Sequence, residues 1–140
     1  MSIRPVTTLI VELGPVYDIG PLPGGFRRVI SIAGGSMTGP VLTGRVLPGG
    51  ADWNTAREDG SADVWARYTV QTDDGVTIGI INAGTLPADA DPDAFVTSPR
   101  LEVPDGALAW LRDVPLVGTL GPVLGRTDAV RIGIFSVHAQ

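Results

Sequence analysis

The 140-residue sequence contains no cysteine and no lysine, and it has a single histidine. Without cysteine there is no disulfide, no thiolate nucleophile and no cysteine-ligated zinc site. All ten basic residues are arginine, so a lysine Schiff base and a lysine contact to a phosphate loop are excluded too. These absences remove several common kinds of catalytic site.

The remaining metal-binding and catalytic patterns are also weak. His138 lies near the end of the sequence, where we expect a frayed and solvated tail rather than a member of a catalytic triad. Asp89, Asp91 and Asp93 resemble the start of a calcium loop, but Arg100 stands where that loop needs a bidentate glutamate. The glycine-rich runs lack the GxGxxG spacing of a nucleotide site. We therefore expect no metal and no cofactor.

Long apolar runs are missing as well. No stretch approaches the roughly 20 apolar residues that a membrane-spanning helix needs, and the first residues lack the apolar core of a signal peptide. We therefore expect a cytoplasmic protein. A net charge of −5 with scattered arginines argues against nucleic acid and against an anionic membrane as partners.

Apolar residues and turn formers dominate what is present. The chain is 44% hydrophobic and carries 19 glycines and 12 prolines, which favours many short strands over long helices. We expect one domain over residues 1–140: an all-β, antiparallel barrel of about seven to nine strands with at most one short helix. A barrel is favoured over a sandwich because Gly44, Gly79 and Gly133 fall inside strands, where a tightly curved sheet must bend.

Alternation of apolar and polar residues locates the strands. The clearest signal is the Asp-Gly step at residues 73–75, which predicts a hairpin between strands over 63–72 and 76–85. Residues 14–25 are predicted to be an irregular connection, and 54–62 to form either a short helical turn or an open loop. Residues 105–112 are predicted to form one or two helical turns with Trp110 and Leu111 packed inward. Further strands are expected over 6–13, 26–33, 41–47, 95–103, 116–124 and 129–137.

Asp52 and Trp53 are the strongest candidates for a functional site. They follow Pro48-Gly49-Gly50, which predicts a turn that presents both side chains at the end of a strand. A carboxyl group beside a large aromatic ring at a cavity mouth is desolvated, which raises its pKa and suits it to acid or base catalysis. The alternative is that Asp52 caps a loop and Trp53 plugs one end of the barrel.

Two strand faces carry further polar residues. Ser98, Arg100 and Glu102 share one face, and the other face is formed by Trp65, Arg67, Thr69 and Gln71. Solvent exposure is the default for both faces; if one points inward, an arginine with a glutamate would anchor a small molecule in an apolar cavity. Asn82 is a plausible amide donor, although a role in a turn is the simpler interpretation.

Five segments follow one another along the chain in the order GGSMTGPVLTGRVLPGGADW, ARYTVQTDDG, INAG, FVTSPRLE and AWL. This series resembles the DUF3237 family of small bacterial and fungal proteins. The resemblance extends from about Phe26 to Val137 and implies a compact antiparallel barrel without an assigned activity. One departure is Val96, where the family often has an arginine. The resemblance places on recurrent positions Asp52, Trp53, Asn82, Arg100, Glu102 and Trp110.

The sequence therefore predicts a small-molecule-binding barrel. The leading hypothesis is a cofactor-independent isomerase, cyclase or lyase that acts on a small apolar or aromatic metabolite, such as one of secondary metabolism. The alternatives are a non-catalytic carrier or sensor and an interaction module whose barrel is filled by side chains. We also expect a homodimer, because an apolar chain tends to leave apolar surface to be covered. The expected catalytic residues are Asp52 and Glu102, and the expected binding residues are Trp53, Trp65, Arg67, Asn82, Arg100 and Trp110.

Overall fold

The computed structural model describes residues 1–89, 91 and 95–139, and these form one antiparallel sheet with a single turn of 3-10 helix. The strands are β1 (Ser2–Leu22), β2 (Gly25–Thr38), β3 (Gly44–Val46), β4 (Gly50–Ala56), β5 (Ala62–Thr72), β6 (Thr77–Leu86), β7 (Phe95–Glu102), β8 (Leu116–Pro122) and β9 (Ala129–His138), and the helical turn is η2 (Ala109–Arg112).

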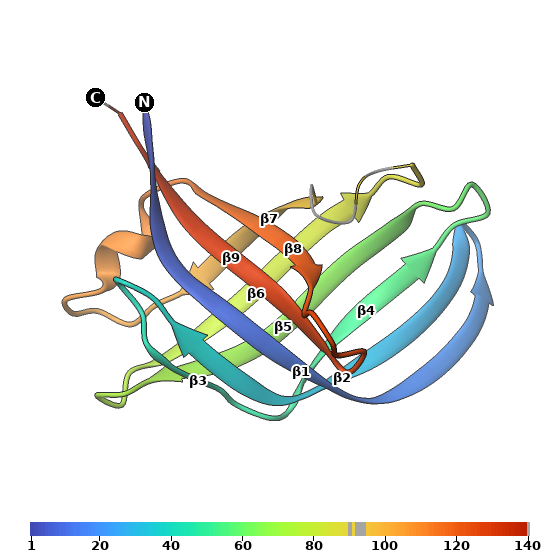
Figure 1. Cartoon of the computed structure of the whole chain (residues 1–140), viewed down its shortest axis with the longest axis horizontal. Coiled ribbons are helices and arrows are strands. Elements are labelled where there is room, and N and C mark those ends of the chain that lie inside the picture. Colours follow the sequence, from blue (N-terminus) through green and yellow to red (C-terminus); the bar gives the residue numbers. More distant parts are fainter. Residues whose placement is uncertain (90, 92–94, 140) are drawn as a thin grey trace.

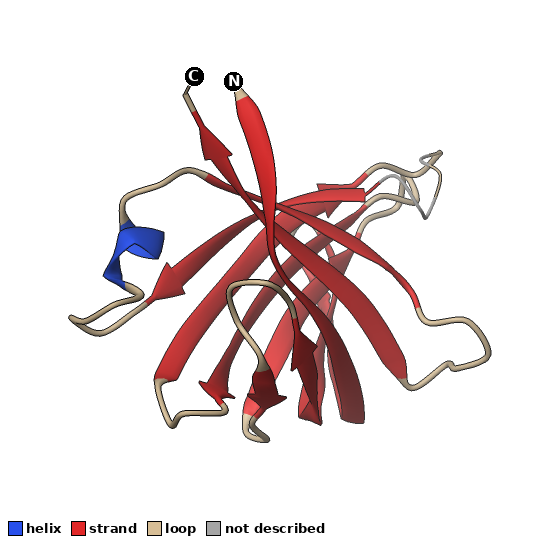
Figure 2. Ribbon diagram, turned by 60° about the vertical axis from the view of Figure 1, so that its left-hand side comes forward, coloured by secondary structure: helices blue, strands red, loops and turns tan. Residues whose placement is uncertain are grey.

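The sheet closes on itself. Neighbouring strands follow the order β1-β9-β8-β7-β6-β5, and β5 pairs with both β3 and β4, which in turn pair with β2. β2 returns to β1, and the two ends of the chain lie side by side where Ser2 pairs with His138 (Figure 1). Figure 2 shows the strands surrounding a common interior. The predicted antiparallel barrel is therefore confirmed.

The hairpin at residues 73–75 is confirmed in detail. β5 and β6 pair in continuous register from Ala62↔Leu86 to Gln71↔Thr77. Gly75 has φ +93°, a left-handed conformation that a turn at an Asp-Gly step requires. The Thr72 hydroxyl accepts from the Val76 N–H and donates to Asp74, which ties the turn together.

The glycines inside strands, which were expected to allow bends, lie at points of close approach. A Cβ atom at Gly44 would lie 2.0 Å from the Gln71 carbonyl oxygen on the facing strand. At Gly79 and Gly133 it would lie 2.5 and 2.6 Å from the side chains of Glu102 and Thr119. Any larger residue at these positions would push neighbouring strands apart.

The N-terminal strand is much longer than predicted. Residues 14–25 were expected to be irregular, but β1 continues to Leu22 and pairs with β2 through three shifts of register. These bulges accommodate Gly14 and Pro15 within the hairpin. β1 does not pair with β9 beyond Glu12. Prolines in the rest of β1 therefore interrupt no hydrogen bonds to β9.

The segment around the first glycine-rich run also differs from the prediction. The strand expected over 41–47 is only Gly44–Val46, and Leu42 is instead tucked into the core beside Val6. Asp52 and Trp53 do not follow a strand: they lie within β4, whose pairing with β2 runs from Gly50 to Ala56. The turn-forming residues at 48–50 had suggested that a strand ends just before Asp52, but they lead into the start of β4 at Gly50.

Two predictions near the C-terminus are wrong. Leu111 of η2 is buried at 1% exposure, but Trp110 beside it is 39% exposed and does not pack inward. His138 does not lie in a frayed tail. It belongs to β9 and pairs with Ser2 of β1, and its Nε2 lies 2.7 Å from the Ser136 hydroxyl. The β1–β9 ladder holds the end of the chain in place.

Inward-facing side chains pack tightly over one half of the barrel, which we call the packed end. The 3-10 turn η2 contributes Leu111 to it, and every member is almost completely inaccessible to solvent. Its largest side chains are Leu9, Met37, Leu42, Ile78, Ile80, Leu111 and Ile134.

The hairpin of β1 and β2 carries exposed apolar residues. Val16, Tyr17 and Ile19 are 49%, 61% and 56% exposed, and the β9 ladder no longer covers this part of β1. An apolar strand edge of this kind favours pairing with another chain. The homodimer stays a prediction, and this hairpin is the surface on which we expect it.

Candidate active site

A cavity of about 190 Å³ occupies the half of the barrel opposite the packed end. Aliphatic side chains supply most of its wall, and four polar side chains interrupt it. The aliphatic lining consists of Val11, Leu13, Ile30, Ile32, Val64, Ala66, Leu86, Leu120, Val130 and Ile132, and the polar lining of Asp52, Asn54, Tyr68 and Asn82.

Three of the lining residues form a row across adjacent strands. Asp52 of β4 pairs with Ala66 of β5, and Ala66 pairs with Asn82 of β6. Directly paired residues point to the same face of a sheet, so the carboxyl and the amide flank the small Ala66 methyl. Two strand spacings separate them by about 10 Å, which leaves room for a small molecule.

The Asp52 carboxylate takes part in the sheet itself. The β4–β5 ladder pairs Asp52 with Ala66 and resumes only at Thr55 and Asp63. In this gap the Trp65 N–H donates to Asp52 Oδ1 at 2.9 Å. The carboxylate thus supplies the acceptor for a backbone donor between the two strands.

Burial raises the pKa of Asp52 above its ordinary value. The Trp65 N–H, a hydrogen bond from the Asn54 side chain and the charges of Arg28 and Arg27 act in the opposite direction but do not cancel the desolvation. A carboxyl group with a raised pKa is both a stronger base when ionised and easier to protonate. It can therefore exchange a proton with a bound molecule.

Three buried polar atoms of the cavity residues have no hydrogen-bond partner. They are Asn54 Oδ1, the Tyr68 hydroxyl and Asn82 Oδ1. Burial also raises the pKa of Tyr68, so the phenol stays protonated and can donate. Because buried polar groups are normally paired, these atoms indicate a site prepared for polar groups of a ligand or for water.

The other predicted site residues lie on the outer face of the barrel. Trp53 follows Asp52 in the strand and therefore points away from the cavity, so it neither desolvates the carboxyl nor plugs the barrel. The default of solvent exposure holds for both polar faces, and Arg67 and Glu102 form a surface ion pair at 3.1 Å. Asn82 lines the same cavity as Asp52, whereas Trp53, Trp65, Arg67, Arg100, Glu102 and Trp110 do not, and Trp65 contacts Asp52 through its backbone N–H.

Sequence reasoning missed Asn54 and Tyr68. Asn54 was assigned to a loop, although its position two residues after Asp52 puts it on the same strand face. Tyr68 stands in the alternation Ala66, Tyr68, Val70, and a phenol within an otherwise small and apolar face was the available signal. The charged and aromatic residues on the opposite face of β5 are the stronger sequence signal for a site.

No group of three or more histidine, cysteine or acidic side chains that could hold a metal occurs in the described part of the chain. Asp89 and Asp91 belong to that part, while Asp93 of the calcium-like run lies outside the described residues. No helix among the described residues is long and apolar enough to cross a membrane.

Comparison with known proteins places the chain in a family. A family model described as "Protein of unknown function (DUF3237)" matches residues 1–137. The chain belongs to this family. It is 31% identical over 128 residues to a UPF0311 protein of Rhodopseudomonas palustris, a match that covers 81% of this chain and 84% of the relative. The resemblance expected from the sequence is thereby confirmed.

Solved structures share the fold. A protein with unknown function from Clostridium acetobutylicum superposes with a TM-score of 0.89 at 27% identity, covering 99% of this chain and all of the other. An enzyme from Penicillium herquei superposes with a TM-score of 0.76 at 22% identity, covering 96% of this chain and 93% of the other. The second likeness concerns the fold alone.

Proposed function

We propose that the protein is a cofactor-independent enzyme that moves a proton on a small, largely apolar molecule held in the barrel cavity. The observation that carries this proposal is the arrangement of a desolvated carboxyl, Asp52, with the unpaired Tyr68 hydroxyl and Asn82 carbonyl in one apolar cavity. Desolvated acid–base groups with unpaired polar neighbours are typical of catalytic pockets.

The cavity limits the size of the substrate. Its volume of about 190 Å³ is slightly larger than an apolar cavity of about 150 Å³ that accommodates benzene. A molecule with one ring and a few substituents therefore fits. The aliphatic walls favour a ring without charge, and the unpaired carbonyl oxygens of Asn54 and Asn82 favour hydroxyl or N–H substituents.

The chemistry that fits these groups is isomerisation through an enol. The ionised Asp52 carboxylate removes a proton from a carbon next to a carbonyl, and the C–H electron pair becomes the carbon–carbon double bond. The Tyr68 hydroxyl donates to the developing oxyanion, which stabilises it in an apolar surrounding. Where the substrate carries a second double bond conjugated with this enolate, Asp52 then delivers the proton to the far carbon of the conjugated system while the carbonyl re-forms, so the double bond moves and no oxidant or reductant is consumed.

The fold is compatible with an enzyme. The structurally similar protein from Penicillium herquei is an enzyme, so a barrel of this shape is compatible with enzymatic activity. Of the two catalytic residues predicted from the sequence, the proposal keeps Asp52 and sets aside Glu102, which forms a surface ion pair with Arg67. We propose the cytoplasm as the place of the reaction.

Deuterium exchange tests the proposal without knowledge of the substrate. Cyclic ketones and enones of one ring are incubated with the protein in D2O, and isotope incorporation is followed by mass spectrometry. We expect Asp52→Asn to lower the exchange rate by about 10²–10⁴-fold while binding, measured by thermal shift, is retained. Tyr68→Phe lowers the rate through the lost donor, and Glu102→Gln on the outer wall leaves it unchanged.

Two outcomes would contradict an enzymatic role. Binding of such rings without any exchange by the wild-type protein would point to a carrier or sensor, in which Asp52 mainly accepts the Trp65 N–H. Exchange that survives Asp52→Asn would show that another group transfers the proton.

A further inference from the structure

A second hollow, which we call the outer groove, lies on the outside of the barrel wall, behind the cavity. It has a volume of about 750 Å³ and is formed by outward-facing side chains of β2, β4, β5, β6 and β7. Val64 is the one residue that lines both hollows. Successive side chains of a strand point to opposite faces, so the sheet separates the two sites.

Two tryptophans form one side of the outer groove. The rings of Trp53 and Trp65 meet edge to face, with centroids 5.7 Å apart and an angle of 64° between planes. Trp65 is 42% exposed, and its neighbour across the sheet is Ala83, which is paired in turn with Ser98. Small residues beside a large aromatic pair leave a hollow in which a flat ring can lie against indole.

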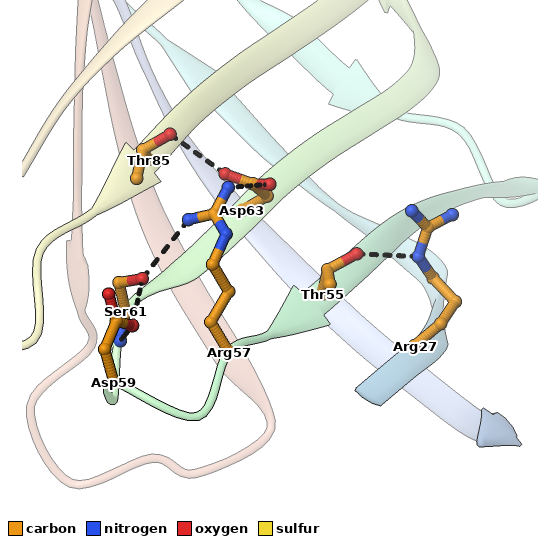
Figure 3. Close-up of polar contacts among 7 residues, drawn as sticks. All are labelled: Arg27, Thr55, Arg57, Asp59, Ser61, Asp63 and Thr85. Atoms are coloured by element: carbon orange, nitrogen blue, oxygen red, sulfur yellow. Dashed lines mark hydrogen bonds and ion pairs between the residues drawn. The ribbon is translucent and has the colours of Figure 1, made fainter. Parts of the chain in front are cut away.

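Arg27 supplies an available positive charge. Its Nε donates to the Thr55 hydroxyl at 2.8 Å, which orients the guanidinium, and Figure 3 shows the two terminal nitrogens turned away from that contact. Among the described residues no carboxylate forms an ion pair with Arg27, so its terminal N–H groups are free for a bidentate acceptor.

The acidic residue of the outer groove is already neutralised. Asp63 Oδ2 is paired with the Arg57 guanidinium, and Asp63 Oδ1 accepts from the Thr85 hydroxyl at 2.9 Å (Figure 3). The Ser61 hydroxyl, held by Asp59 at 2.6 Å, also contacts Arg57. Of the two charged residues that line the groove in the described part of the chain, Asp63 has an ion-pair partner and Arg27 has none.

We propose that the outer groove binds a small planar carboxylic acid, with its aromatic ring against Trp53 and Trp65 and its carboxylate on the guanidinium of Arg27. The planar fork of arginine matches the two oxygens of a carboxylate, and the indoles supply apolar contact to the ring. The volume lies within the range of small-molecule sites and accommodates two fused rings. This proposal does not rest on the acid–base chemistry proposed for the cavity.

Calorimetric titration with 2-naphthoate tests the proposal. We expect saturable binding at low salt that weakens with ionic strength, and about tenfold weaker binding of the neutral amide 2-naphthamide. Arg27→Gln removes the difference between acid and amide. Trp65→Ala weakens both ligands, and Trp65→Phe, which keeps a ring, restores part of the affinity if the alanine variant is poorly folded.

Matched controls distinguish this site from others. Arg100→Gln removes an exposed arginine of the outer wall that does not line the groove, and Trp110→Phe alters the tryptophan beside His138; neither changes the affinity for naphthoate. Absence of saturable binding, equal affinity for the amide, or binding unaffected by Arg27→Gln would overturn the proposal.

Discussion

The packed end and the cavity are built from the same strands, yet they differ in what faces inward. Along β9, Ile134 is fully buried at the packed end, whereas Ile132 lines the cavity two residues earlier. Along β6, Ile78 and Ile80 fill the core, and Asn82 follows on the same face with an unpaired carbonyl oxygen. One half of the barrel is thus filled by aliphatic side chains, and the other contains a cavity with polar groups in its wall.

Residue size and polarity cause this difference. Leu111 of η2 covers the packed end, where long aliphatic side chains from opposite strands meet. Towards the cavity, the small Ala66 lies between Asp52 and Asn82, and four polar side chains interrupt an otherwise aliphatic wall. Buried polar groups without partners and an unfilled interior both cost stability, and this cost is the physical basis of the proposed function.

The largest expected effect is a difference in stability between alanine variants of two isoleucines on β9. Ile134→Ala leaves a void in a filled core and is expected to lower the free energy of unfolding by about 2–5 kcal/mol. Ile132→Ala costs distinctly less, because its side chain already borders empty space and has fewer contacts to lose. Denaturation by guanidinium measures both; equal losses would mean that the cavity is filled in solution.

A smaller effect separates two buried hydroxyl groups. The Thr7 hydroxyl donates to the Leu42 carbonyl at 2.9 Å, so Thr7→Val is expected to cost about 1–3 kcal/mol by leaving that carbonyl unpaired. The Tyr68 hydroxyl has no partner, and Tyr68→Phe is expected to be neutral or slightly stabilising. A large loss for Tyr68→Phe would reveal a structural hydrogen bond, for example to buried water, and weaken its assignment to ligand binding.

The smallest effect concerns the pH dependence of stability. Because the folded-state pKa of Asp52 is raised, the native protein binds more protons than the unfolded chain between the ordinary value of 3.8 and the raised one. This group therefore lowers stability as pH rises through that window. We expect Asp52→Asn to have a Tm a few degrees above wild type at neutral pH, with the difference shrinking below the ordinary value.

The variant must be compared with wild type at every pH, because other carboxyl groups act oppositely. The pKa values of Asp59 and Asp128 are lowered by hydrogen bonds from Ser61 and Arg126, so their contribution to stability is lost in acid. Because both proteins contain Asp59 and Asp128, the contributions of these residues cancel when the Tm of the variant is compared with that of wild type at the same pH. If Asp52→Asn lowers Tm at neutral pH, the ionised carboxylate is chiefly a partner for Trp65.

The sequence by itself determined the fold class and the β5–β6 hairpin. These features depend on short-range signals, namely the alternation of side chains and an Asp-Gly turn. It also selected Asp52 and Asn82 as site residues, which are the two predicted residues that line the cavity.

Only the tertiary structure decided which strand face points inward and which residues meet there. The face with Trp65 and Arg67 carries the more conspicuous chemistry, but closure of the ring turns Ala66 and Tyr68 inward instead. Likewise, the bulges in β1 depend on its pairing with β2, which brings together residues as distant as Thr8 and Thr38. Sequence periodicity reveals that a strand has two faces, whereas the choice between inside and outside is made by strands that are remote in the chain.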